Sequence, residues 1–151
     1  NPVLPVRELG RQLARRRLFW DTRLNPFPVR GWHPGSVEPD ILEEYLTEAF
    51  DRASLSVLLM MLRWATHRHF QSEDGRIDYE ERFANLNLPL LVLAGEHDRL
   101  APPESCQPAY DRSQSTDRTF TTYPMGHIDL ICGREAPQTV WPTIRDWLVR
   151  H

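Results

Sequence analysis

Residues 88–103 read LPLLVLAGEHDRLAPP, and this stretch decides the fold. Its first part, Leu88–Ala94, is a short apolar run that stops at Gly95, which is typical of a parallel β-strand covered on both faces. The loop after this strand carries Asp98. Because ligands and catalytic groups of open α/β sheets collect at the carboxyl ends of the strands, Asp98 is the first candidate functional residue.

A second strand further along the chain ends in a similar loop. We predict this strand over Thr119–Tyr123, with a helix over Glu104–Arg112 before it, and the loop after it carries His127. Consecutive parallel strands lie side by side, so the two loops can meet at one edge of the sheet. A carboxylate bonded to one imidazole nitrogen would fix the tautomer and leave the other nitrogen free to act as a general base.

The first half of the chain has a different texture from the second. Its expected helices are Val6–Trp20, Pro39–Phe50 and Ser54–Arg68, and residues 25–39 are a loop rich in proline and glycine. The third helix has apolar residues of its own on nearly all of its faces, and we therefore expect it to be buried on several sides. A last helix is expected over Ala136–Arg150, with Pro142 kinking it or marking its true start. The predicted fold class is α/β, because residues 86–151 read strand, helix, strand, helix.

Composition and charge exclude several classes of protein. The 151 residues suit one domain, and their 18 basic side chains, all arginine, stand against 21 acidic ones. A pI near 6.1 argues against a dedicated nucleic-acid binder. No apolar run approaches the roughly 20 residues that span a bilayer, so a membrane partner is not expected. Cys106 and Cys132 are too few for a disulfide scaffold, and we expect them to be reduced, although a single bridge is left open.

The order of these motifs resembles the C-terminal part of an α/β-hydrolase. That family has a strand, G-x-x-D, a proline pair, a helix, a strand, Gly-His and a final helix. This chain supplies Gly95 to Asp98, Pro102-Pro103 and Gly126-His127 in that order. The residues from His127 to Gly133 further resemble the tail of the acid-lipase-like branch. The resemblance implies that residues 1–85 are a helical cap and that residues 86–151 are the C-terminal part of the hydrolase core.

The resemblance also implies roles for two residues. Asp98 would be the acid and His127 the base of a Ser-His-Asp triad that attacks carboxylic esters through an acyl-enzyme. The family carries its serine in G-x-S-x-G, and no serine here has that spacing. His33, between Gly31 and Gly35, occupies the serine position of a similar glycine pair, which we interpret as a decoy. By family order the nucleophile lies in an N-terminal half ahead of Asn1, and this chain alone is not expected to hydrolyse esters efficiently.

Each candidate also has a plain structural interpretation. Asp98 could simply cap the helix that follows, without a catalytic role, and His127 could be a packed loop histidine. We interpret Asp129 as a turn-stabilising carboxylate rather than as a second acid. His97, beside Asp98, is expected to be exposed. The remaining candidates are assigned to packing or to no site: Met60, Met61 and Trp64 to core packing rather than an acyl pocket, and His67 and His69 to no metal site.

The leading functional hypothesis is an esterase or lipase-like hydrolase with the catalytic residues Asp98 and His127. The alternatives are a non-catalytic α/β module that binds a partner, and another chemistry on the same fold, such as a dehalogenase or an acyltransferase. The expected partners are a small-molecule ester and the N-terminal half of the same hydrolase, with no nucleic acid, and a homo-oligomer is left open. No cofactor and no metal are expected, and the expected location is cytoplasmic.

Overall fold

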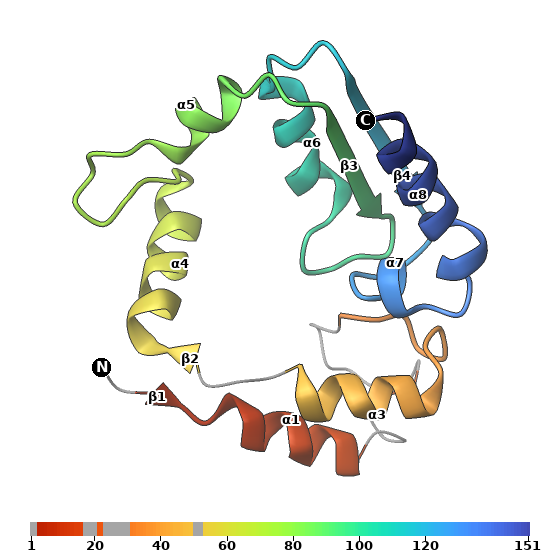
Figure 1. Cartoon of the computed structure of the whole chain (residues 1–151). Coiled ribbons are helices and arrows are strands. Elements are labelled where there is room, and N and C mark those ends of the chain that lie inside the picture. The colour runs from red at the N-terminus through yellow and green to blue at the C-terminus, as the bar shows by residue number, and fades with distance from the viewer. Residues whose placement is uncertain (1–2, 17–20, 23–30, 50–52) are drawn as a thin grey trace.

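The computed structural model describes residues 3–16, 21–22, 31–49 and 53–151 of the chain. The described elements follow one another around an open ring, as Figure 1 shows, with the N-terminal helices on one side and the parallel strands on another. The expected ends of the first two helices, Trp20 and Phe50, lie outside the described residues. Within the described part of the chain, no helix combines the length and the apolar character needed to cross a membrane.

The two N-terminal helices pack against each other. Helix α1 (Val6–Arg15) lies beside helix α3 (Pro39–Glu48), as Figure 1 shows. Proline suits the start of α3 because the first-turn amides have no partner within the helix. The negative charge of Asp40 in the same turn interacts favourably with the positive end of the helix dipole. The core cluster beside these helices consists of Ala14, Val37, Leu42, Leu46 and Ile128. Because Ile128 comes from the loop of the candidate base, this core ties the N-terminal helices to the functional region.

Helix α4 (Leu55–His67) is more exposed than its sequence predicts. It follows a short antiparallel pair, β1 (Val3–Leu4) and β2 (Ala53–Ser54), and the small helix α5 (Tyr79–Ala84) comes after it; neither the pair nor α5 was predicted. The expectation that α4 is buried on several sides is wrong for the described residues, because none of its side chains is buried. Ring contacts of Trp64 with Phe70 and Tyr79 cover one face, and most of the apolar side chains elsewhere on α4 stay open.

The predicted strand–helix–strand unit is present. Strand β3 (Leu90–Gly95) pairs in parallel with β4 (Arg118–Tyr123), and α6 (Pro103–Arg112) connects them and packs against β3. The first ladder bond runs from the Leu90 amide to the Asp117 carbonyl, whereas Pro89 has no amide hydrogen to donate. Although its sequence is typical of a strand covered on both faces, only Ala94 and Gly95 of β3 are buried, because β4 is the one strand that pairs with it among the described residues.

The C-terminal helices close the second core. The loop after β4 leads into the short helix α7 (Asp129–Cys132), the 3₁₀ helix η1 (Ala136–Gln138) and helix α8 (Val140–Arg150). The helix break before Val140 fits the prediction that Pro142 marks a true start, since proline is tolerated in the first turn. Met125, Ala136 and Val140 form the buried centre of this cluster. The C-terminal region therefore has the predicted α/β order, with α7 and η1 added.

Candidate active site

Asp98 and His127 meet at the carboxyl ends of the two parallel strands. Asp98 Oδ2 lies 2.8 Å from His127 Nδ1. The strand register brings this about, because Gly95 pairs with Tyr123 and the two loops leave the sheet together. The Glu96 amide then donates to the Tyr123 carbonyl at 2.8 Å, which joins the loops at their start. Two residues far apart in the sequence are thus held as one hydrogen-bonded pair.

Gly95 is required by this junction rather than by a special backbone angle. A Cβ at this position would overlap the carbonyl oxygen of Met125, and it would lie 3.1 Å from the Gly126 oxygen. The His97 amide donates to the Met125 oxygen at 3.0 Å. The glycine of the G-x-x-D pattern therefore allows two loops to touch through their backbones. These are the acid loop, residues 96–102, which carries Asp98, and the histidine loop, residues 124–128, which carries His127.

Asp98 uses its two carboxylate oxygens for different tasks. Oδ1 accepts the amides of Leu100 and Ala101 at 2.8 and 2.9 Å, and Oδ2 faces His127. Burial raises the pKa of Asp98, but the Ala101 amide, the His127 ring and the Leu100 amide together outweigh it and hold the pKa below its ordinary value. The loop-capping interpretation and the triad interpretation of Asp98 are therefore compatible, since each uses one oxygen of an ionised carboxylate.

The imidazole of His127 is anchored on one side and open on the other. Its side chain is 46% exposed, whereas that of Asp98 is 3% exposed. An ionised carboxylate only accepts hydrogen bonds, so the neutral ring carries its proton on Nδ1 and presents the lone pair of Nε2. Among the described residues, Asp98 is the hydrogen-bond partner of this ring. The arrangement can accept a proton at Nε2 and stabilise the resulting imidazolium.

Neither cysteine is placed as a nucleophile for this pair. Both are free thiols, so a bridge between them is absent. Burial raises the pKa of the Cys106 thiol, and the nearby carboxylates of Asp98 and Glu104 raise it further. Burial and Asp129 act in the same direction on Cys132. A raised pKa keeps a thiol protonated at neutral pH and lowers its reactivity.

A second histidine-rich feature borders the acid loop. A cavity of about 420 Å³ is lined by Trp32, His33, Pro34, Glu96, His97, Asp98 and Arg99. The rings of His33 and His97 lie 5.4 Å apart between centroids. His97 is exposed, as expected, and also lines this cavity. Sequence reasoning missed His33 as a neighbour of the site, because its glycine spacing indicated only a failed serine motif.

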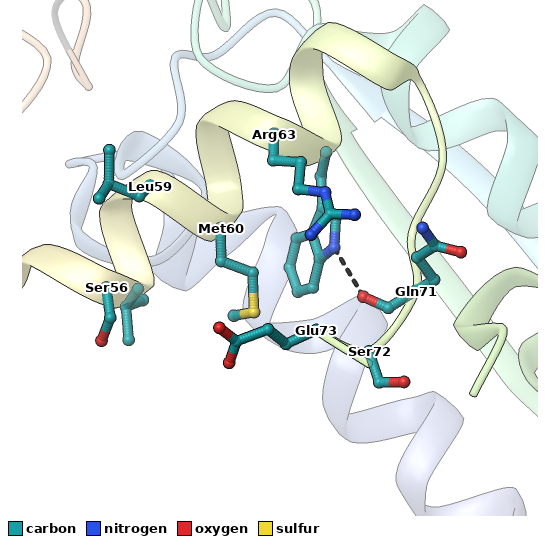
Figure 2. A pocket seen from close by; sticks show the side chains of 9 residues that line it. Ser56, Leu59, Met60, Arg63, Gln71, Ser72 and Glu73 are labelled. Atoms are coloured by element: carbon teal, nitrogen blue, oxygen red, sulfur yellow. Dashed lines mark hydrogen bonds between the residues drawn. The ribbon is translucent and has the colours of Figure 1, made fainter. Parts of the chain in front are cut away.

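Another pocket lies on α4, and neither Asp98 nor His127 lines it. Its lining includes Met60, Arg63, Trp64 and Glu73, and its volume is about 270 Å³. Figure 2 shows Met60 extending toward Glu73 and marks the 2.8 Å hydrogen bond from the Trp64 indole to the Gln71 carbonyl. The assignment of Met60, Met61 and Trp64 to core packing is wrong for the described residues, because Met61 is exposed and the other two are only partly buried.

The described residues hold no cluster of three or more side chains suited to a metal ion. His69 instead lies near two carboxylates, with 3.4 Å from its Nε2 to Asp78 and 3.8 Å from its Nδ1 to Glu80. Both distances join atoms of two side chains and lie within ion-pair range.

Comparison with known families identifies the fold. A model of the family described as serine aminopeptidase, S33, matches residues 66–129, a range that contains β3, Asp98, β4 and His127. Together with the parallel strand pair, this match confirms the resemblance inferred from the sequence: the chain is similar to the α/β-hydrolase superfamily over these residues and has part of its fold.

Two curated relatives narrow the comparison. The chain is 35% identical over 63 residues to a poly(3-hydroxyalkanoate) polymerase subunit PhaC of Haloarcula marismortui, covering 42% of this chain and 13% of that protein. It is 36% identical over 79 residues to the subunit of the same name from Haloferax mediterranei, covering 52% of this chain and 15% of that protein. The matches thus span about one seventh of the length of these relatives.

Proposed function

We propose that this chain supplies the acid and the base of an acyl-transfer centre, with Asp98 as the acid and His127 as the base. The observation that carries the proposal is the 2.8 Å pair at the carboxyl ends of adjacent parallel strands. The substrate we propose is an ester or thioester of a 3-hydroxyalkanoate. This choice is supported by the two polymerase relatives, whose names specify a polyester of such units.

The pair would act twice in each cycle. First, His127 Nε2 takes the proton of a nucleophilic hydroxyl or thiol, which attacks the acyl carbonyl while Asp98 stabilises the imidazolium. The proton then goes to the departing alcohol or thiol, which leaves an acyl-enzyme. Next, His127 removes the proton of the acceptor hydroxyl, and attack by that oxygen releases the nucleophile, which regains a proton from His127. A hydroxyl of a growing chain as acceptor gives polymerisation, and water gives ester hydrolysis.

The nucleophile is proposed to come from a part of the protein outside these residues. The α/β-hydrolase order would put it N-terminal to a cap, and we assign residues 1–85 to that cap and residues 86–151 to the core. In support, the described residues place no serine or cysteine in hydrogen-bond contact with His127. We therefore expect the 151-residue chain alone to form no acyl-enzyme when it is incubated with a 3-hydroxybutyryl thioester and analysed by intact mass.

Hydrolysis remains the second candidate function, favoured by the exposure of His127, which leaves its open nitrogen accessible to water. The two functions differ in the acyl acceptor. The distinguishing measurement is the product formed by the full-length protein from a 3-hydroxybutyryl thioester. Polyester indicates transfer to a hydroxyl, and free 3-hydroxybutyrate indicates transfer to water.

The test of the common proposal is His127→Ala in the full-length protein. Removing the base should lower kcat by about 10³-fold or more, whichever acceptor is used. His67→Ala, which removes an exposed histidine at the end of α4, is the matched control and should leave kcat unchanged. Turnover by His127→Ala at the rate of the control would exclude His127 from the mechanism. A protein that binds a partner but never turns over a 3-hydroxyacyl ester would support the non-catalytic alternative.

A further inference from the structure

Asp129 is one of the most buried polar residues described, with 1% of its surface exposed. It opens α7, two residues after His127. Its Oδ2 accepts the Gly126 amide at 2.8 Å and also the His33 amide at 2.8 Å. One carboxylate oxygen therefore holds the backbone directly before the candidate base and a backbone amide 96 residues earlier in the chain.

The His33 bond belongs to a longer contact between two segments. The segments are residues 31–38, which follow the undescribed residues 23–30, and residues 126–134, which carry the candidate base. The Ile128 amide donates to the Gly31 carbonyl at 2.6 Å, and the Arg134 amide donates to the Ser36 carbonyl at 2.9 Å. Between these bonds the Asp129 carboxylate accepts the His33 amide, and at the far end Arg134 Nη2 lies 3.1 Å from Glu38 Oε2. The Asp129 carboxylate therefore sits where the proposed cap meets the histidine loop.

Gly126 shows how tightly this junction is built. A Cβ at Gly126 would lie 2.8 Å from Asp129 Oδ2 and 3.0 Å from the His33 nitrogen. Both distances are shorter than an ordinary van der Waals contact, so a side chain at this position would displace the carboxylate. The glycine before the candidate base is thus explained by the approach of Asp129.

A purely local turn does not explain these contacts. A turn needs only the bond from Asp129 to Gly126, whereas the bond to His33 joins distant segments. The other oxygen, Oδ1, is buried and has no hydrogen-bond partner among the described residues. A buried unpaired oxygen costs free energy, so a neutral side chain would stabilise a simple turn at lower cost. Two amides on one carboxylate oxygen form charge-assisted bonds, which are stronger and better directed than neutral ones.

The structure assigns Asp129 the role of a positioning residue, which holds the Gly126–His127 backbone so that the His127 ring faces Asp98. It also couples the His33 side of the neighbouring cavity to the histidine loop. The geometric part of this inference stands on the contacts alone, and its consequence for turnover rests on the proposed function. Asp129 touches no reacting atom in this assignment and acts through His127.

The test compares Asp129→Ala and Asp129→Asn with Asp78→Ala in the full-length protein. Asp78 is the matched control, because its exposed carboxylate also accepts a backbone amide, that of Glu81 at 3.0 Å, but caps α5 away from the pair. The first readout is the downfield proton resonance of His127 Nδ1–H, which reports the hydrogen bond to Asp98 without any need for turnover. The second readout is the separate change in kcat and KM.

Asp129→Ala should shift or abolish the His127 resonance and lower kcat on the order of 10–100-fold, with KM nearly unchanged, because the ring is misplaced. Asp129→Asn keeps an oxygen acceptor without the charge, so it should show a smaller shift in the same direction. Asp78→Ala should lose stability but keep both the resonance and kcat. If Asp129→Ala does not fold, the Asp129→Asn shift decides the question.

A resonance in both Asp129 variants identical to that of the unmodified protein would overturn the positioning role. The outcome for the proposed function is separate. If His127→Ala keeps its turnover, the proposed function fails whatever the Asp129 variants show. If His127→Ala is inactive and the resonance is unmoved in the Asp129 variants, only the present inference fails.

Discussion

Gly95 and Met125 touch through their backbones, with no room for a methyl group between the Cα of the first and the carbonyl oxygen of the second. This contact joins the two loops of the site, because the loop of Asp98 begins after Gly95 and His127 follows Met125 by two residues. The spacing of the two loops therefore depends on this main-chain contact, to which the hydrogen bonds of the Asp129 side chain add.

Gly95→Ala should destabilise the chain and separate the two loops. The added methyl must push the Met125 carbonyl away, which we expect to cost about 1–3 kcal/mol in the free energy of unfolding. Urea denaturation followed by circular dichroism measures this change. Gly31→Ala is the control, because its Cβ would make ordinary contacts of 3.5 Å with Ile128 and 3.6 Å with Leu100. Equal stability of the two variants would contradict the close contact.

The charge of Asp98 should stabilise the fold in a pH-dependent manner. The pKa of Asp98 is lowered in the folded chain, so the unfolded chain binds more protons as the pH falls. The stabilisation is therefore complete above the ordinary pKa of about 3.9 and is lost as the pH falls through the folded value. The measurement is the difference in unfolding free energy between the unmodified chain and Asp98→Asn, whose oxygen can still accept the loop amides. A difference that stays constant from pH 7 to pH 2 would contradict this account.

Leu42 and Leu62 should respond very differently to truncation. Leu42 on α3 is 1% exposed and belongs to the first core, whereas Leu62 on α4 is 54% exposed. Leu42→Ala should cost about 2–5 kcal/mol, because it removes transfer free energy and leaves a cavity. Leu62→Ala should change stability by about 0.5 kcal/mol or less. Chemical denaturation of the two variants of the 151-residue chain checks the prediction, and a large loss in Leu62→Ala would mean that another surface covers α4.

His151 should titrate above its ordinary pKa. The Trp147 carbonyl and then the Asp117 carboxylate, which lie 2.7 and 2.6 Å from its two ring nitrogens, raise the pKa of His151. A raised folded pKa means that the stabilisation is complete below the unfolded value of about 6.5 and is lost as the pH rises through the folded one. An NMR titration of the ring protons should show a lower pKa in Asp117→Asn. Asp146→Asn, which removes an exposed charge from α8, the helix that ends just before His151, should leave the pKa of His151 nearly in place. Equal shifts in both variants would refute the specific contact.

The parallel strands and the Asp98–His127 pair could be predicted because their signals are local. An apolar run that ends at Gly95 indicates a strand, and an acid and a histidine after successive strands are expected at one sheet edge. The match of the family model to residues 66–129 confirms the fold, and the catalytic roles stay a prediction. The positions of Asp98 and His127 could be predicted because each residue follows directly after a single strand.

Other features could not be read from the sequence, because they depend on contacts between distant segments. The amide of His33 meets Asp129, and nothing in either neighbourhood signals the other. The exposure of α4 shows a second kind of limit. The apolar residues around this helix indicate that it needs cover, but they do not say whether the described residues supply it. The sheet has a similar limit, since β3 has the sequence of a covered strand, whereas β4 is the single strand that pairs with it among the residues that the structure describes.

The contact of residues 31–38 with residues 126–134 has a kinetic consequence. Strand β3, helix α6 and strand β4 are close in sequence, so they can associate early at a small cost in chain entropy. The bond from His33 to Asp129 closes a loop of 96 residues and yields its stabilisation only when both ends are already ordered. We therefore expect the histidine loop to reach its final alignment in the last step of folding. The histidine loop would also be the first part to open in partial unfolding. Hydrogen exchange at the Gly126 and Ile128 amides would therefore be faster than at the amides that join β3 to β4.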